Sequence, residues 1–219
     1  MTPARERLLL PLLNAHREAL TSCRRCELLP EGAGPVVSAA TRPVAMLVGQ
    51  APGKVETVDR RPFAGRAGRT LFSWLALADI DEETARDRIY IAAMTRCYPG
   101  PHPSGRGDRV PSTSERLACS KWLDSELRLL EPPVLLLVGR LAIERFLPAR
   151  PLTELVGRTM ETRHAGGRSL AIPLPHPSGA SSWLNVAEHR ALVDRALVHV
   201  RREIGSLLLA DCSARRRAG

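Results

Sequence analysis

Four short apolar segments, separated by helix-like stretches, constrain the fold of this chain more than any other feature. The segments are PVAMLVG (43–49), RIYIAAM (88–94), PVLLLVG (133–139) and SLAIPLP (169–175). Their nearly continuous hydrophobicity is typical of strands that are covered on both faces. Strands that alternate with helices favour right-handed crossovers and a parallel sheet. The sequence therefore predicts an α/β fold, a three-layer α/β/α sandwich with a central four-stranded parallel sheet.

Helical patterns follow or separate these segments. The expected helices cover residues 68–79, 112–130, 139–147 and 183–209. The second begins with Ser112 and has Glu115 three residues later, which is the spacing of a capping box. A chain of 219 residues can bury one good core. We expect one domain over residues 1–210 and a basic, disordered tail at 211–219.

The first twenty residues, MTPARERLLLPLLNAHREAL, mix charged residues with leucines and are not followed by a small-residue cleavage site. No segment reaches the roughly 18 apolar residues that span a bilayer. We therefore expect a soluble, cytoplasmic protein without a membrane partner. In that compartment the five cysteines are not expected to form structural disulfides.

The net charge of +9 favours a polyanionic partner, because a protein that neutralises phosphates releases condensed counterions. Nucleic acid is the first candidate. An alternative is that the charge reflects genomic base composition, since only Lys54 and Lys121 among the 32 basic residues are lysines. The location of the charges decides between these two interpretations.

Ligands of open parallel sheets bind beyond the carboxyl ends of the strands. The segments that follow the four predicted strands are GQAPGKVE, TRCYPG, GRLAIERF and HPSGASSW, and we expect them to meet at one rim. The turn of Gln50, Ala51, Pro52 and Gly53 offers amides to a planar ligand. Phe63 offers an aromatic face, and Gly65 leads into a helix amino terminus that suits an anion. Each of these features alone is weak, because a strand-to-helix turn or a core phenylalanine would look the same.

The pentapeptide PHPSG occurs twice, at 101–105 and at 175–179. His176 follows the fourth predicted strand between two prolines, where it can donate to an anion that develops on a bound base. His102 lies in the long irregular loop 98–111, without a strand directly before it. The position of the second copy is therefore typical of a functional site, whereas the first copy is explained by the ordinary composition of a loop.

A CxxC pair and two single cysteines form a plausible metal-binding set. Cys23 and Cys26 form CRRC, Cys97 follows the second predicted strand, and Cys119 lies in the helix after the long loop. Four thiolates suit zinc or an iron–sulfur cluster, and the spacing alone does not choose between them. The alternative is a redox pair at 23 and 26 with two buried core thiols.

Taken together, these segments resemble the uracil-DNA glycosylase superfamily, in particular its iron–sulfur branch, families 4 and 5. GQAPGKVETVDRRPFAGRAGRTL is similar to the family 4 turn and its following PF-x-G-x-AG segment, and YIAAMTRC to the family 5 strand. HPSGASSW resembles the superfamily's intercalation loop, and its SG-x-S part also the mismatch-specific branch. The resemblance covers nearly the whole chain from Cys23 to the terminal helix.

The resemblance implies a monofunctional DNA repair glycosylase that removes uracil, and other deaminated bases as a further option, from flipped-out nucleotides. It implies a structural [4Fe-4S] cluster on the four cysteines, no nucleotide cofactor, and a monomer that is nucleoid-associated when bound to DNA. Phe63 would stack on the base, the Gln50–Gly53 turn would contact it, and His176 would donate to the oxygen that gains charge. DNA contacts are expected from Arg66, Arg69, Arg106, Arg109, Ser178, Gly179 and Ser181.

The sequence departs from the family patterns at the catalytic acid. Gln50 stands where family 4 has glutamate, Ala93 where it has asparagine, and Arg66 near the family 5 aspartate. Aligning RGDRVPSTSE with the basic loop of the branch that traps uracil-DNA covalently places Asp108 at its nucleophilic histidine. Asp108 is our first candidate for the acid, ahead of Asp59 and Glu56, and a simple turn residue is the alternative.

Two other function classes fit parts of the sequence. The departures at Gln50 and Ala93 would permit a uracil-DNA-binding protein without turnover. A nucleotide-binding or redox protein on the same sheet is disfavoured, because the chain has neither G-x-G-x-x-G nor a P-loop.

Overall fold

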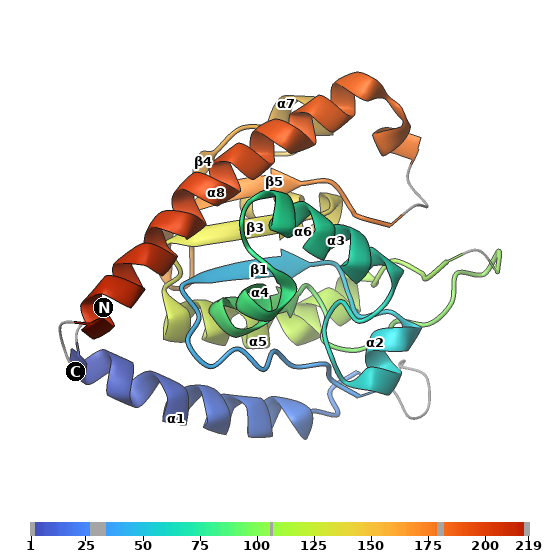
Figure 1. The fold of residues 1–219 in the computed structure, drawn as a ribbon. Coiled ribbons are helices and arrows are strands. Elements are labelled where there is room, and N and C mark those ends of the chain that lie inside the picture. The colour runs from blue at the N-terminus through green and yellow to red at the C-terminus, as the bar shows by residue number, and fades with distance from the viewer. Residues whose placement is uncertain (1–2, 27–33, 106, 179–181, 217–219) are drawn as a thin grey trace.

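The computed structural model describes residues 3–26, 34–105, 107–178 and 182–216 (Figure 1). Its sheet has five strands in the order β2-β1-β3-β5-β4. The strands are β1 (Ala45–Gly49), β2 (Ile89–Ala93), β3 (Val134–Val138), β4 (Met160–His164) and β5 (Gly167–Leu174). All pairs are parallel except β4 with β5, which is antiparallel.

The predicted α/β class and the four parallel strands are confirmed, and the sheet has one further, antiparallel strand that was not predicted. The additional strand, β4, has the sequence METRH and forms an edge with partly exposed residues. Charged side chains on an edge strand discourage pairing with other chains. They also remove the apolar run by which the other four strands are recognised.

The helices lie on both faces of the sheet (Figure 1). They are α1 (Pro3–Thr21), α2 (Lys54–Asp59), α3 (Arg66–Leu77), α4 (Glu82–Arg88), α5 (Thr113–Leu130), α6 (Arg140–Phe146), α7 (Leu152–Leu155) and α8 (Ala187–Arg216), with a 3₁₀ turn η1 (Ser182–Asn185). The helix expected at 183–209 is thus divided between η1 and α8. Residues 211–216, which we expected in a tail, continue α8. None of the described helices is long and apolar enough to cross a membrane.

Successive side chains of the strands alternate between two buried clusters, one on each face. Leu47 of β1 packs with residues of α3, α4 and α8 in one cluster. Met46 and Val48 pack with residues of α1, α5 and α6 in the other. Each cluster joins one layer of helices to a face of the sheet, which gives three layers. The carboxyl edge of the sheet is left to the loops that carry the candidate site.

Candidate active site

The loops beyond the parallel strands surround a cavity of about 670 Å³. In the β1–β2 register Gly49 pairs with Ala93, so the segments after these strands leave the sheet side by side. Side chains from all four post-strand segments line the cavity, among them Gln50, Arg96, Arg140 and His176. The expectation of one shared rim is therefore matched by the structure.

Phe63 lies against the end of β1 in a tight turn. A Cβ on Gly49 would come within 3.2 Å of the Phe63 ring, and one on Gly68 within 1.8 Å of the Phe63 carbonyl oxygen. Phe63 has a left-handed φ of 51°, which is uncommon for a bulky residue. Arg86 braces this backbone by donating to the carbonyl oxygens of Pro62 (2.8 Å) and Phe63 (3.1 Å). The ring is thus held as part of the cavity wall.

The Glu56 carboxylate joins two parts of the rim. One oxygen accepts from the Gly53 N–H at 3.0 Å, and the other accepts from the Gly65 N–H at 2.8 Å. Glu56 is buried, and both of its oxygens are engaged. It therefore holds the Gln50–Gly53 turn against the start of α3. Asp59 is exposed at the end of α2 and is not among the residues that line the cavity.

The His176 ring packs into the same cavity. Its Nδ1 accepts from the Ser178 N–H at 3.2 Å and lies 2.8 Å from the Ser178 hydroxyl. Burial lowers the pKa of His176, and the Asp108 carboxylate opposes that shift. A neutral ring whose Nδ1 accepts carries its proton on Nε2. A Cβ on Gly139, which has a φ of 87°, would lie 3.2 Å from the ring, so glycine permits this close packing.

Asp108 faces His176 and the Gln50–Gly53 turn from the loop after β2. A Cβ on Gly53 would lie 3.0 Å from Asp108 Oδ2. The Tyr98 hydroxyl donates a hydrogen bond to this carboxylate. Asp108 is exposed, yet it lines the cavity together with His176. The structure thus brings together the two residues that sequence reasoning placed first.

Gln50 and the three residues after it form part of the cavity wall, as Phe63 does. Gln50, Ala51, Pro52 and Gly53 all line the cavity. The Gln50 carbonyl oxygen accepts from the Thr95 N–H at 3.3 Å, which continues the strand pairing past the end of the sheet.

The residues expected to contact DNA lie in different places. Arg66, Arg109 and Ser178 line the cavity, whereas Arg69 is exposed one turn further along α3 and does not. Arg109 donates both terminal nitrogens to the Glu115 carboxylate, so it anchors the loop. Arg106, Gly179 and Ser181 lie outside the described residues.

Sequence reasoning missed Arg140, which lines the cavity, and Tyr98, which donates to Asp108. Tyr98 directly follows Cys97, and Arg140 opens α6 one residue after Gly139, which follows β3. The rule that ligands bind beyond the carboxyl ends of strands points to both positions.

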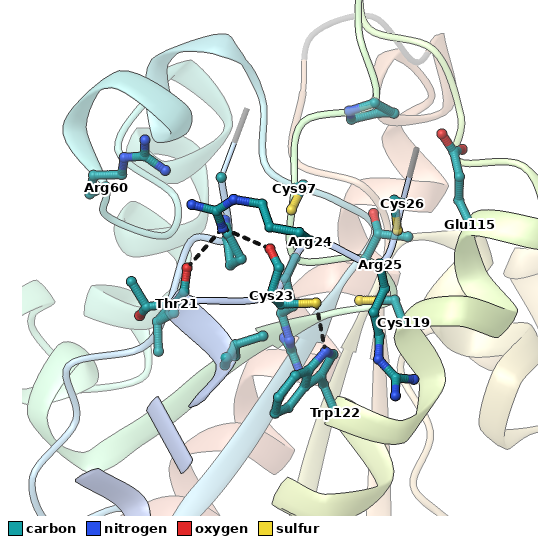
Figure 2. A pocket seen from close by; sticks show the side chains of 17 residues that line it. Thr21, Cys23, Arg24, Arg25, Cys26, Arg60, Cys97, Glu115, Cys119 and Trp122 are labelled. Atoms are coloured by element: carbon teal, nitrogen blue, oxygen red, sulfur yellow. Dashed lines mark hydrogen bonds between the residues drawn. The ribbon is translucent and has the colours of Figure 1, made fainter. Parts of the chain in front are cut away.

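The four cysteines proposed as ligands line a second cavity, of about 650 Å³ (Figure 2). Cys23 and Cys26 follow α1, Cys97 follows β2 and Cys119 belongs to α5. All five cysteines of the chain are described, and all are free thiols. The Trp122 indole N–H lies 3.2 Å from the Cys23 sulfur (Figure 2). Cys212 is exposed on α8, far along the chain from this cavity.

The four thiols of this cavity suit a metal-containing group that binds sulfur. Burial, with the neighbouring Cys119, Cys26 and Cys23 adding to it, raises the pKa of Cys97 to about 12. Four thiolates gathered there would repel one another unless a metal-containing group compensated their charge. Two buried polar atoms beside the thiols, Thr95 Oγ1 and Arg96 Nε, have no hydrogen-bond partner within the described part of the chain. In the part of the chain that the structure describes, no three His, Cys, Asp or Glu side chains lie close enough together to bind a single metal ion.

Comparison with known proteins identifies the family. The model of the uracil DNA glycosylase superfamily matches residues 37–197. A type-4 uracil-DNA glycosylase of Thermotoga maritima is 27% identical over 168 residues, 76% of this chain and 82% of that protein. Proteins of the same name from Sulfurisphaera tokodaii (25% over 171 residues; 75% and 73%) and Archaeoglobus fulgidus (27% over 165 residues; 73% and 78%) are similar too. With a family match that extends from before β1 into α8, the chain belongs to the uracil DNA glycosylase superfamily.

Proposed function

We propose that the protein is a DNA repair glycosylase that hydrolyses the N-glycosidic bond of uracil in DNA and leaves an abasic site. Its relatives are named uracil-DNA glycosylases, and it shares their family. The observation that carries the proposal is a single cavity lined by an aromatic ring, a neutral histidine and a carboxylate: Phe63, His176 and Asp108.

The reaction requires stabilisation of two opposite charges. The bond between C1′ and the base nitrogen breaks, and its electron pair leaves with uracil, while the sugar gains oxocarbenium character. A flipped uracil stacks on Phe63, and His176 Nε2–H donates to the carbonyl oxygen that becomes negative. Asp108 faces the sugar, stabilises its positive charge and accepts the proton of the water whose oxygen bonds to C1′.

Gln50 takes part through binding rather than through charge. Its side-chain amide offers one acceptor and one donor to the edge of the base, and it carries no charge that could stabilise the sugar. The amides of the Gln50–Gly53 turn add close contacts along the same edge. Of the three acids considered, Glu56 is engaged by two backbone N–H groups and Asp59 lies off the cavity, which leaves Asp108.

We further propose that Cys23, Cys26, Cys97 and Cys119 hold a [4Fe-4S] cluster with a structural role. A single zinc ion would need all four sulfurs at about 2.3 Å from one point. A cluster binds each cysteine to a different iron, which suits thiols spread around one cavity. When bound, the cluster supplies positive iron charge that keeps the thiols ionised, and the cysteines join α1 to β2 and α5.

An incision assay on uracil-containing oligonucleotides tests the function, and Asp108→Asn tests the role of the acid. The purified protein should convert uracil sites into abasic sites that alkali cleaves. Asp108→Asn should keep uracil-DNA binding and lose at least about a hundredfold in turnover, a typical effect of removing a general base. Asp59→Asn is the matched control and should keep wild-type activity.

Each outcome of this assay has a distinct meaning. A wild-type protein that binds uracil-DNA but releases no uracil would be the binding protein without turnover. If Asp59→Asn lost activity while Asp108→Asn did not, the acid would belong to α2.

A further inference from the structure

The first PHPSG copy folds into the same turn as the second. In the first, His102 Nδ1 lies 2.7 Å from the Ser104 hydroxyl and accepts from the Ser104 N–H at 3.2 Å. The corresponding distances for His176 and Ser178 are 2.8 Å and 3.2 Å. The two turns therefore present the same local chemistry, and only their surroundings differ.

The first turn is braced as the tip of a small hairpin. The His102 N–H donates to the Gly107 carbonyl oxygen at 2.9 Å, and the Arg109 N–H donates to that of Gly100 at 3.0 Å. At the base of the hairpin, the Arg109 guanidinium is forked onto Glu115 of α5. These contacts hold the hairpin in one conformation.

The tip is exposed and open. His102 and Ser104 are both exposed. Gly105 and Gly107 have φ values of 72° and 75°, and a Cβ on either would have no atom within 4 Å. Nothing in the described chain covers this surface, so it is free to meet a partner.

Both turns stand at the same opening. Gly107, which pairs with His102, and Asp108, the next residue, line the cavity together with His176 and Ser178. Figure 1 shows the loop between β2 and α5 projecting outward from the carboxyl edge of the sheet. A DNA strand that delivers a nucleotide into this cavity would therefore come close to both turns.

We propose that the His102–Ser104 turn is a second DNA contact, which engages the strand opposite the uridine when the substrate is a duplex. This inference rests on the proposed function. The uridine strand is occupied at the cavity mouth, so a projection beyond the mouth meets the complementary strand. An exposed imidazole and hydroxyl are groups that bind DNA phosphates and fix the duplex in place without reading its sequence.

The competing explanation is that the turn only positions the Asp108 carboxylate, because Asp108 pairs with Pro101 in the same hairpin. The two explanations differ in their dependence on the substrate. A contact to the complementary strand matters only for duplex DNA, whereas a misplaced Asp108 would slow excision from single strands equally.

The test compares one uracil-containing oligonucleotide as a single strand and as a duplex, in both binding and excision. The variant is His102→Ala combined with Ser104→Ala, and the control is His199→Ala in the middle of α8. We expect duplex binding and kcat/KM to fall roughly five- to tenfold, as for the loss of one or two hydrogen bonds. Single-strand values should stay within about twofold, and the control should match the wild type on both substrates.

Equal losses on both substrates, or no loss on either, would overturn the inference. A melting temperature equal to that of the wild type excludes misfolding of the variant. The binding measurements distinguish the failure of this inference from the failure of the proposed function. A wild-type protein that does not excise uracil refutes the proposed function. Its affinities for duplex and single-stranded DNA, compared with those of the variant, still decide the role of the turn.

Discussion

At the scale of single residues, the two PHPSG copies show that surroundings rather than sequence decide what a histidine can do. His102 and His176 share one hydrogen-bonding pattern. His176 alone packs against Gly139 inside the cavity, where burial lowers its pKa. A neutral imidazole there donates from Nε2, and its partner is the group that gains negative charge.

We expect His176 to stay neutral throughout the neutral pH range. Because its pKa in the folded protein lies below 6.5, the folded state resists a proton that the unfolded chain accepts, so this group lowers stability as pH falls below 6.5. NMR of the imidazole nitrogens should show the Nε2–H form at pH 7. In Asp108→Asn the His176 pKa should fall further, since a carboxylate that favours the imidazolium is gone.

The kinetic counterpart uses a single-stranded substrate. His176→Ala should lose about a hundredfold or more in excision rate, the usual cost of removing a donor to a developing anion. His102→Ala should be close to wild type on that substrate. An imidazolium at pH 7, or a larger loss for His102→Ala, would contradict this assignment.

At the scale of elements, the loop that carries Asp108 is tied to the start of α5. The predicted capping box is present: Ser112 Oγ accepts from the Glu115 N–H at 3.2 Å, and Glu115 accepts from the Ser112 N–H at 2.7 Å. Hydrogen bonds from Arg109, with those of Ser112, lower the pKa of Glu115 to about 2. One carboxylate thus caps the helix and holds the hairpin.

This pair predicts how stability depends on pH. Glu115 has a folded pKa of about 2 against an ordinary 4.5, so its contribution is complete above pH 4.5 and is lost as pH falls toward 2. Arg109→Gln should therefore melt below the wild type at pH 7, and the gap should narrow at pH 3. Arg202→Gln, which breaks the surface pair with Glu203, should change stability by less than about 1 kcal/mol at either pH. A gap for Arg109→Gln that is the same at both pH values would contradict this role.

The elements that the sequence predicts are those with a strong local signal. Apolar runs locate four strands to within two residues, and Ser112 with Glu115 marks the start of α5. β4 has charged residues instead of an apolar run, and α1 contains Pro11, which weakens a helical pattern. The contact of Asp108 with the Gly53 turn and the fork of Arg109 onto Glu115 are tertiary, so no periodicity reports them. Similarly, the segment GQAPGKVE does not predict that the Glu56 carboxylate accepts hydrogen bonds from two backbone N–H groups.

At the scale of the whole molecule, the charge of +9 should act through phosphates at the rim. The logarithm of the duplex affinity should fall with the logarithm of salt, with a slope of roughly −0.9 for each phosphate neutralised. Arg66→Ala combined with Arg69→Ala, at the start of α3, should reduce the slope by about two. Arg168→Ala is the control, since β5 begins at the opposite edge of the sheet. A duplex affinity that does not change with salt concentration would indicate that the positive charge reflects genomic base composition rather than DNA binding.

The cysteine site ties together segments that are distant in the chain. Cys23 and Cys26 follow α1, whereas Cys97 and Cys119 belong to the region between β2 and the middle of α5. A group bound by all four thiols stabilises the fold by its full binding free energy, because the unfolded chain has no preformed site. Its removal should therefore loosen α1 and lower the melting temperature of the whole molecule.

We expect freshly purified protein to be brown and to contain about four irons per chain if a [4Fe-4S] cluster is bound. Oxidative removal of the cluster should bleach the protein and lower its melting temperature by roughly 10 °C or more, since each kcal/mol lost costs about 2–4 °C at this size. Cys119→Ser should reproduce both effects, while Cys212→Ser, which alters an exposed thiol, should reproduce neither. A colourless protein with one zinc per chain would refute the cluster but not the structural role of the site. Bleaching without a change in melting temperature would refute the structural role, because the cysteines would then hold a group on which the fold does not depend.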